Sequence, residues 1–216
     1  MVNIAENRRN IFPYIPKSIS SEAFFVWLMN YLDSDKEYEK YKQSFFDKLL
    51  LKKEDIGKPV SEIVVNSQER NLESVLSFHF KEAAEMYDIL LLFGNQISNM
   101  VSQEQLNRYK RLYPKCYRYI YYKVGYITTT EELCINHNQF ELITDGMMES
   151  VLETMNELHP LIEMYTDYLQ NEGDAVNTYY ERIFLKHDKE VLKQPAAQKY
   201  LLDTFLENSG EDLWNI

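Results

Sequence analysis

The sequence has few of the residues that cross-link or interrupt a chain. Its 216 residues include only 2 cysteines, 6 glycines and 6 prolines. Cys116 and Cys134 form no CxxC pair, which argues against a zinc site and favours free thiols in a reducing compartment. The low glycine and proline content argues against a fibrous or disordered chain.

Long apolar runs and excess positive charge are missing too. The longest apolar run, residues 89–93, is far too short to span a membrane, and the N-terminal residues lack the apolar core of a signal peptide. We therefore expect a cytoplasmic protein without membrane contact. The 23 Lys and Arg against 34 Asp and Glu give a net charge of −11. This disfavours tight nonspecific binding to nucleic acid, but it leaves room for a local basic patch.

Apolar residues are abundant enough for a packed core, at 45% hydrophobic and 14% aromatic. Their spacing predicts an α/β domain with a helical C-terminal part. The expected strands are 60–65, 72–80, 87–93, 116–127 and 140–143. The expected helices are 20–32 with Ser20 or Ser21 as its cap, 37–51, 102–112, 130–138, 147–158, 160–171, 174–187 and 195–208.

The central strands carry the main structural prediction. Residues 72–80 alternate between apolar and polar positions, and 87–93 is continuously apolar, as in a strand buried on both faces. We expect 72–80, 87–93 and 117–124 in one sheet, with 87–93 central. The spacing of Leu72, Val75 and Leu76 also suits a helix, so one continuous helix over 72–85 is the alternative.

Five short segments stand out by their order and spacing. Residues 21–29 read Ser-Glu-Ala-Phe-Phe-Val-Trp-Leu-Met, and Glu73 follows Gln68 by five residues. Gly94-Asn95-Gln96 ends the apolar run, and nine residues after Gln96 comes Gln105-Leu106-Asn107-Arg108-Tyr109. The stretch 119–127, rich in Tyr and Ile, closes the series. Over about residues 10–169 the chain thus resembles a bacterial branch of the PD-(D/E)XK nuclease superfamily.

The resemblance implies a restriction-endonuclease-like fold, with a central mixed sheet flanked by helices. It implies a single structural domain, in which residues 1–145 form the nuclease-like core and a helical part, 146–216, packs on it. The family-equivalent catalytic positions are Glu22, Glu73, Gln96, Gln105 and Tyr109. Gln105 and Tyr109 should then face the strand end at 94–96, although the pair could merely pack on the sheet.

The chemistry of this family needs two carboxylates to hold Mg²⁺ and a nearby cation to orient water. Glu73 can replace the expected Asp, as the one remaining metal ligand. Gly94 and Gln96 stand where a Glu and a Lys belong, so the ligand set and the positive charge are incomplete. Glu22 and Glu73 also have ordinary interpretations, as a first-turn helix carboxylate and an exposed strand residue.

Three hypotheses about function follow. The first is a catalytically degenerate nuclease domain that binds nucleic acid, such as DNA, or a partner protein, in conflict with phage or mobile elements. The second is an active Mg²⁺-dependent nuclease with a non-standard site. The third is an acidic interaction protein that does not contact nucleic acid, supported by the net charge alone.

Overall fold

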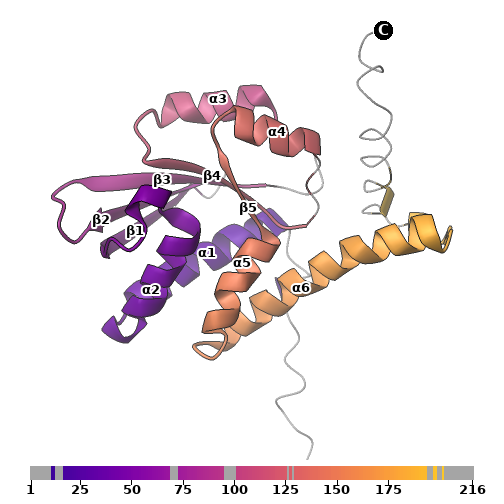
Figure 1. Ribbon diagram of the computed structural model, residues 1–216, viewed down its shortest axis with the longest axis horizontal. Helices are drawn as coiled ribbons and strands as arrows, with labels where there is room; N and C mark the ends of the chain where they lie inside the picture. Colours follow the sequence, from indigo (N-terminus) through magenta and orange to yellow (C-terminus); the bar gives the residue numbers. More distant parts are fainter. Residues whose placement is uncertain are drawn as a thin grey trace, which may run out of the picture.

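The chain folds around one five-stranded mixed sheet in a computed structural model (Figure 1). The strands lie in chain order. β1 (Val60–Gln68), β2 (Glu73–Phe80) and β3 (Met86–Phe93) are antiparallel, whereas β4 (Arg118–Lys123) and β5 (Glu141–Thr144) run parallel to β3. The predicted α/β class and the central place of 87–93 are confirmed. The structure describes residues 11–12, 17–68, 73–94, 101–125, 127, 129–193, 197–198 and 201.

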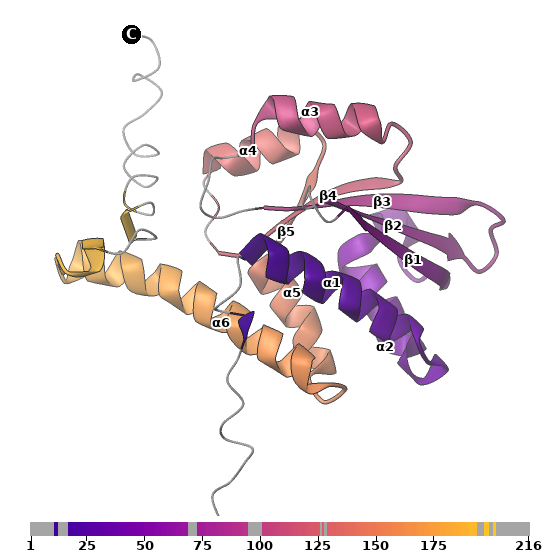
Figure 2. The same ribbon diagram turned by 180° about the vertical axis from the view of Figure 1, so that it is seen from behind.

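Helices cover both faces of the sheet (Figures 1 and 2). One face, which we call the α3 face, carries α3 (Gln103–Leu112) and α4 (Thr129–His137) over a small hydrophobic cluster. The other, the α1 face, packs a larger cluster against four helices. These are α1 (Lys17–Asp33), α2 (Glu39–Phe45), α5 (Asp145–Leu152) and α6 (Pro160–Tyr180). The C-terminal helices α5 and α6 thus share one core with the N-terminal ones.

The strand pattern follows the sequence. In β2, Leu76 and Phe78 are buried on the α1 face, whereas Val75 packs on the α3 face. This is the alternation expected of a strand, and the helix alternative for 72–85 is wrong. The last five residues of β3, 89–93, are all buried, as expected for a strand covered on both sides.

β1 lies at one edge of the described sheet and contains a bulge. Ser61 pairs with His79 and Val64 with Ser77, so two residues of β1 stand opposite one residue of β2. Glu62, inside the bulge, has a φ of 49°, in the left-handed region. The bulge locally interrupts the regular ladder between β1 and β2.

The first helix begins earlier than predicted. α1 starts at Lys17, so Ser20 and Ser21 lie inside it and are buried, and the prediction of either as its cap is wrong. Ser21 Oγ accepts a hydrogen bond from the Tyr165 hydroxyl at 2.9 Å. Tyr165 OH also lies 3.1 Å from the hydroxyl of Tyr122 on β4. These buried hydroxyls satisfy one another between α1, α6 and the sheet.

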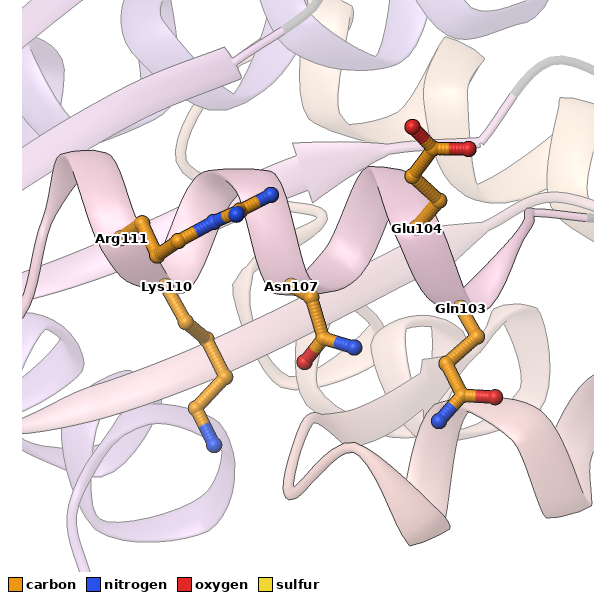
Figure 3. A pocket seen from close by; sticks show the side chains of 5 residues that line it. All are labelled: Gln103, Glu104, Asn107, Lys110 and Arg111. Atoms are coloured by element: carbon orange, nitrogen blue, oxygen red, sulfur yellow. The ribbon is translucent and has the colours of Figure 1, made fainter.

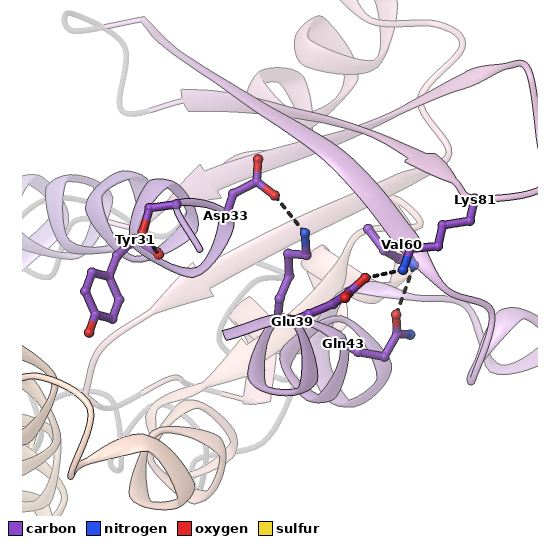
Figure 4. Close-up of polar contacts among 8 residues, drawn as sticks. Tyr31, Asp33, Glu39, Gln43, Val60 and Lys81 are labelled. Carbon is purple, nitrogen blue, oxygen red and sulfur yellow. Dashed lines mark hydrogen bonds and ion pairs between the residues drawn. The ribbon is translucent and has the colours of Figure 1, made fainter. Parts of the chain in front are cut away.

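The predicted helix 37–51 is divided into η3 (Lys36–Tyr38), α2 and the π-helical turn η4 (Phe46–Leu50). Side chains join this segment to its neighbours (Figure 4). Gln43 Oε1 accepts a hydrogen bond from the Val60 backbone N–H at 2.9 Å, and Lys81 forms an ion pair with Glu39. Helix α2 is therefore fixed against one end of the β1–β2 pair, where β1 begins and β2 ends.

Two polar side chains, Tyr117 and Arg118, connect the segment after α2 to the start of β4. The Arg118 guanidinium donates to the carbonyls of Leu49 and Leu51, at 3.1 and 2.8 Å, at the end of η4, where helical carbonyls need partners from outside the helix. Its other edge forms an ion pair with Glu141. The Tyr117 hydroxyl donates to Asp55 Oδ2 at 2.6 Å.

The C-terminal half contains one longer helix than expected. α6 runs without interruption from Pro160 through Tyr180, so the predicted break at 172–173 is wrong. The predicted helix 195–208 lies largely outside the described residues. No helix among the described residues is long and apolar enough to cross a membrane. The remaining short elements are η5 (Lys53–Asp55), η6 (Glu153–Met155), η7 (Glu181–Leu185) and η8 (Val191–Lys193).

Candidate functional site

One row of side chains crosses the sheet near the start of β2 and the ends of β3 and β4, and it reaches β5 at Leu142. Glu73 pairs with Leu92, Leu92 with Tyr121, and Tyr121 with Leu142. Residues directly paired across strands point to the same face of a sheet. Leu92 and Tyr121 belong to the cluster under α3 and α4, so Glu73 also lies on the α3 face.

Glu73 is held by phenols from α3 and the turn after it. Its side chain is only 3% exposed. The Tyr113 hydroxyl donates to Glu73 Oε1 at 3.2 Å, and Tyr109 contacts the same carboxylate. Burial, followed by the negative charge of Glu73, raises the pKa of both phenols. Glu73 Oε2 is buried and has no hydrogen-bond partner within the described part of the chain.

Gly94 follows β3 at a crowded point of the α3 face. Its N–H donates to the Tyr122 carbonyl at 2.8 Å, which extends the ladder between β3 and β4. A Cβ at Gly94 would lie 2.5 Å from the Tyr121 hydroxyl and 2.8 Å from its Cζ. Both distances are shorter than van der Waals contact. The Tyr121 ring thus fills the space into which any side chain at position 94 would have to grow.

Tyr121 cannot easily give way, because it is buried and hydrogen-bonded. It is 5% exposed, and its hydroxyl donates to Glu131 Oε1 of α4 at 3.4 Å. Burial, and then the charge of Glu131, raises the pKa of Tyr121, so the phenol stays neutral.

The same face contains a buried ion pair that sequence reasoning missed. Lys123 of β4 bonds Glu131, and the two side chains are 2% and 1% exposed. Lysine is almost never fully buried unless it is paired. A lysine inside the apolar stretch 119–127 was the available signal, because it calls for a buried carboxylate nearby. The positive charge of Lys123 is thereby neutralised within the α3 face.

Glu22 lies on the opposite side of the sheet from Glu73. It is 7% exposed, and its Oε1 accepts a hydrogen bond from Ser74 Oγ at 3.1 Å. Consecutive strand residues point to opposite faces, so Ser74 faces α1 when Glu73 faces α3. The two predicted site carboxylates are therefore brought to neighbouring residues of β2, but on different faces.

The two predicted residues of α3 have different surroundings. Tyr109 packs on the cluster of the α3 face and contacts Glu73, as a site residue should. Gln105 is exposed, and its side chain turns back to accept from Ser102 N at 3.0 Å, while Ser102 Oγ accepts from Gln105 N. This capping box occupies Gln105 at its own helix end. Gln96 lies outside the described residues.

The described residues offer few ligands to a Mg²⁺ ion at Glu73. Mg²⁺ takes six oxygen ligands and is usually held in proteins by one or two carboxylates. Position 94 has no side chain and no room for one, and Glu131 is bonded to Lys123. Among the described residues, no three His, Cys, Asp or Glu side chains are grouped so that they could hold a metal.

No family model, curated protein or solved structure matches the chain.

Proposed function

We propose that this chain is a nuclease-like domain that binds nucleic acid without cleaving it. One observation carries the proposal: the Tyr121 hydroxyl occupies the space that a side chain at Gly94 would need. A second carboxylate at that position, the partner that Glu73 requires for metal chemistry, has no room. The order of the five sequence segments supports nuclease ancestry, and the arrangement of β2, β3, α3 and β4 follows that order.

The state of the basic group points the same way. Hydrolysis of a phosphodiester needs a cation that orients or polarises the attacking water. Lys123 is the lysine of this face next to Gly94, and its charge is already matched by Glu131 in a buried pair. Breaking such a pair costs about 3–5 kcal/mol, so Lys123 is a poor source of catalytic charge. By analogy with the family, the biological setting would be conflict with phage or mobile elements.

An active nuclease is the second candidate, and one observation favours it. Glu73 Oε2 is buried without a hydrogen-bond partner among the described residues. A buried acceptor left unsatisfied costs about 1–3 kcal/mol, and a bound cation would remove that cost. This atom is the reason to test cleavage as well as binding.

Two assays on the full chain separate the candidates. Supercoiled plasmid is incubated with excess protein and Mg²⁺ or Mn²⁺, and labelled duplex and single-stranded DNA and RNA are titrated in gel-shift experiments. We expect a shift at low salt and no nicking. Nonspecific binding of this kind has a Kd of about 1–100 µM at physiological salt.

The variant Glu73→Gln provides the control, because it removes the charge and keeps the shape. Nicking by the wild type that Glu73→Gln abolishes, and that the exposed-site variant Glu82→Gln retains, would establish the active nuclease instead. Absence of any shift, even at low salt, would refute nucleic-acid binding and leave the acidic interaction protein.

A further inference from the structure

The outward side of α3 carries a polar stripe with a shallow hollow along it. The hollow has a volume of about 710 Å³ and is lined by Gln103, Glu104, Asn107, Lys110 and Arg111. Residues three, four and seven apart lie on one side of a helix. Figure 3 shows Gln103, Asn107 and Lys110 projecting to the same side of α3, with Arg111 extended across it. The stripe runs the length of the helix.

The segment that contains this stripe is positively charged, whereas the chain as a whole is negatively charged. Residues 103–115 contain four basic side chains, Arg108, Lys110, Arg111 and Lys115, and a single acidic one, Glu104. The chain as a whole has a net charge of −11. With four basic side chains and one acidic one, α3 and the turn that follows it carry a local net charge of +3.

Three of these four groups remain available to a ligand. Arg108, Arg111 and Lys115 are exposed, and none of them forms an ion pair within the described part of the chain. Many other basic side chains are paired with carboxylates, as Lys42 is with Asp33. The described ion pairs are Lys42–Asp33, Lys58–Asp55, Lys81–Glu39, Arg118–Glu141, Lys123–Glu131, Arg182–Asp188, Lys193–Glu190 and the contact of His79 with Glu62.

Lys110 contributes in a different way. Its Nζ donates to Gln139 Oε1 at 2.6 Å and to the Asn138 carbonyl at 3.3 Å, both of which are neutral. These bonds fix Lys110 against the turn before β5, and no carboxylate within the described residues cancels its charge. The positive patch is thus anchored to the sheet and does not rest on flexible side chains alone.

We propose that the outer face of α3 and the turn to Lys115 bind the phosphate backbone of a nucleic acid. Arg108, Arg111 and Lys115 would neutralise phosphates, with Gln103 and Asn107 donating hydrogen bonds. Ten residues of helix extend about 15 Å, the length of several phosphate spacings. Bonds of this kind position a strand and carry no sequence information. The proposal rests on the proposed function, and it names the surface through which that function acts.

Salt dependence of binding is the test, because each neutralised phosphate releases a counterion. The triple variant Arg108→Gln/Arg111→Gln/Lys115→Gln is compared with Lys36→Gln/Lys40→Gln/Lys53→Gln, three exposed lysines around α2. Both variants change the net charge equally. For duplex DNA, the slope of log K against log salt should become shallower by about 0.9 for each phosphate that is no longer neutralised, roughly 2–3 in all for the α3 variant. The α2 variant should keep the wild-type slope.

The outcomes separate this proposal from the proposed function. Equal slopes for the wild type and the α3 variant would overturn the α3 surface and leave nucleic-acid binding standing, as would an equally shallow slope in the α2 variant. Failure of the wild type to bind nucleic acid, including binding only to anionic lipid vesicles, would overturn both. Arg108→Lys/Arg111→Lys should retain the slope, since phosphate neutralisation needs the charge. Circular dichroism confirms that each variant is folded.

Discussion

Replacement of Gly94 by alanine tests the close approach on which the proposed function depends. The new Cβ would lie 2.5 Å from the Tyr121 hydroxyl and 3.0 Å from the ring carbon Cε1. Tyr121 is a rigid, buried ring and cannot swing away as a surface side chain could. Overpacking of this kind costs about 1–3 kcal/mol. With a urea m-value of about 2–3 kcal/mol/M, the unfolding midpoint should fall by roughly 0.3–1.5 M.

The matched control is Gly146→Ala. A Cβ at Gly146 meets nothing within 4 Å, and the residue lies in helix α5. Alanine at a compatible helical position stabilises by about 0.4–1 kcal/mol, so this substitution should raise the midpoint. The two glycine-to-alanine changes are therefore expected to have opposite signs.

A double-mutant cycle isolates the interaction between the two positions. Tyr121→Leu removes the hydroxyl and the outer ring atoms, and it should be destabilising alone because it leaves a cavity and deprives Glu131 of a donor. In the Tyr121→Leu background, Gly94→Ala should cost about 1–2 kcal/mol less than in the wild type. If Gly94→Ala is as stable as the wild type, or if the two changes are additive, Tyr121 does not close the space at position 94, and a second carboxylate could be accommodated there.

Three further predictions concern stability and metal binding. Arg118→Ala removes the guanidinium donor from the Leu49 and Leu51 carbonyls, so urea unfolding should show a loss of about 2–4 kcal/mol; an unchanged midpoint would contradict this. The pKa of Asp55 is held below 3.8, first by the hydrogen bond from a nearby lysine and then by that from a tyrosine. Its stability contribution is therefore fully present above pH 3.8 and is lost as the pH falls below that value, so the stability difference between wild type and Asp55→Asn should be largest near pH 7 and shrink as the pH is lowered below 3.8. Gly94→Glu/Gln96→Lys should gain Mn²⁺ affinity in calorimetry only when Tyr121→Leu is added; a gain without that change, or tight Mn²⁺ binding by the wild type, would refute the closed site.

Sequence patterns over a few neighbouring residues correctly predicted the strands β2 and β3 and the start of α3. The alternation in β2 and the apolar run in β3 correctly predicted both strands. Side chains alternate between the two faces of a strand, so the order of apolar and polar residues reflects which positions are buried. Ser102 caps α3 as predicted. The role of Gln105 was predicted from the family resemblance, as a site residue. Ser102-x-x-Gln105 is also the sequence signature of a capping box, and that is the role in which the structure places Gln105.

The misses depend on residues far apart in the chain. Serine is common at helix caps, but Ser21 lies inside α1, where its hydroxyl accepts a hydrogen bond from Tyr165, a residue 144 positions away in the sequence. Gly94 meets Tyr121 only because β4 returns beside β3. No local pattern encodes either contact, and both decide what the candidate site can do. The alignment of Glu73 with Tyr121 across the sheet therefore could not be predicted from the sequence, because it depends on the register of the strands.

The bulge in β1 has a consequence for the behaviour of the protein at high concentration. An edge strand with unpaired backbone groups can recruit an identical strand from another molecule and so start aggregation. Val64 is 47% exposed on this edge, which would favour such recruitment. The bulge at Glu62, whose side chain is 79% exposed and whose carboxylate lies 3.8 Å from His79 Nε2, interrupts the regular ladder that a second strand would have to match along β1. The irregularity thereby disfavours pairing of this edge with a strand from another molecule.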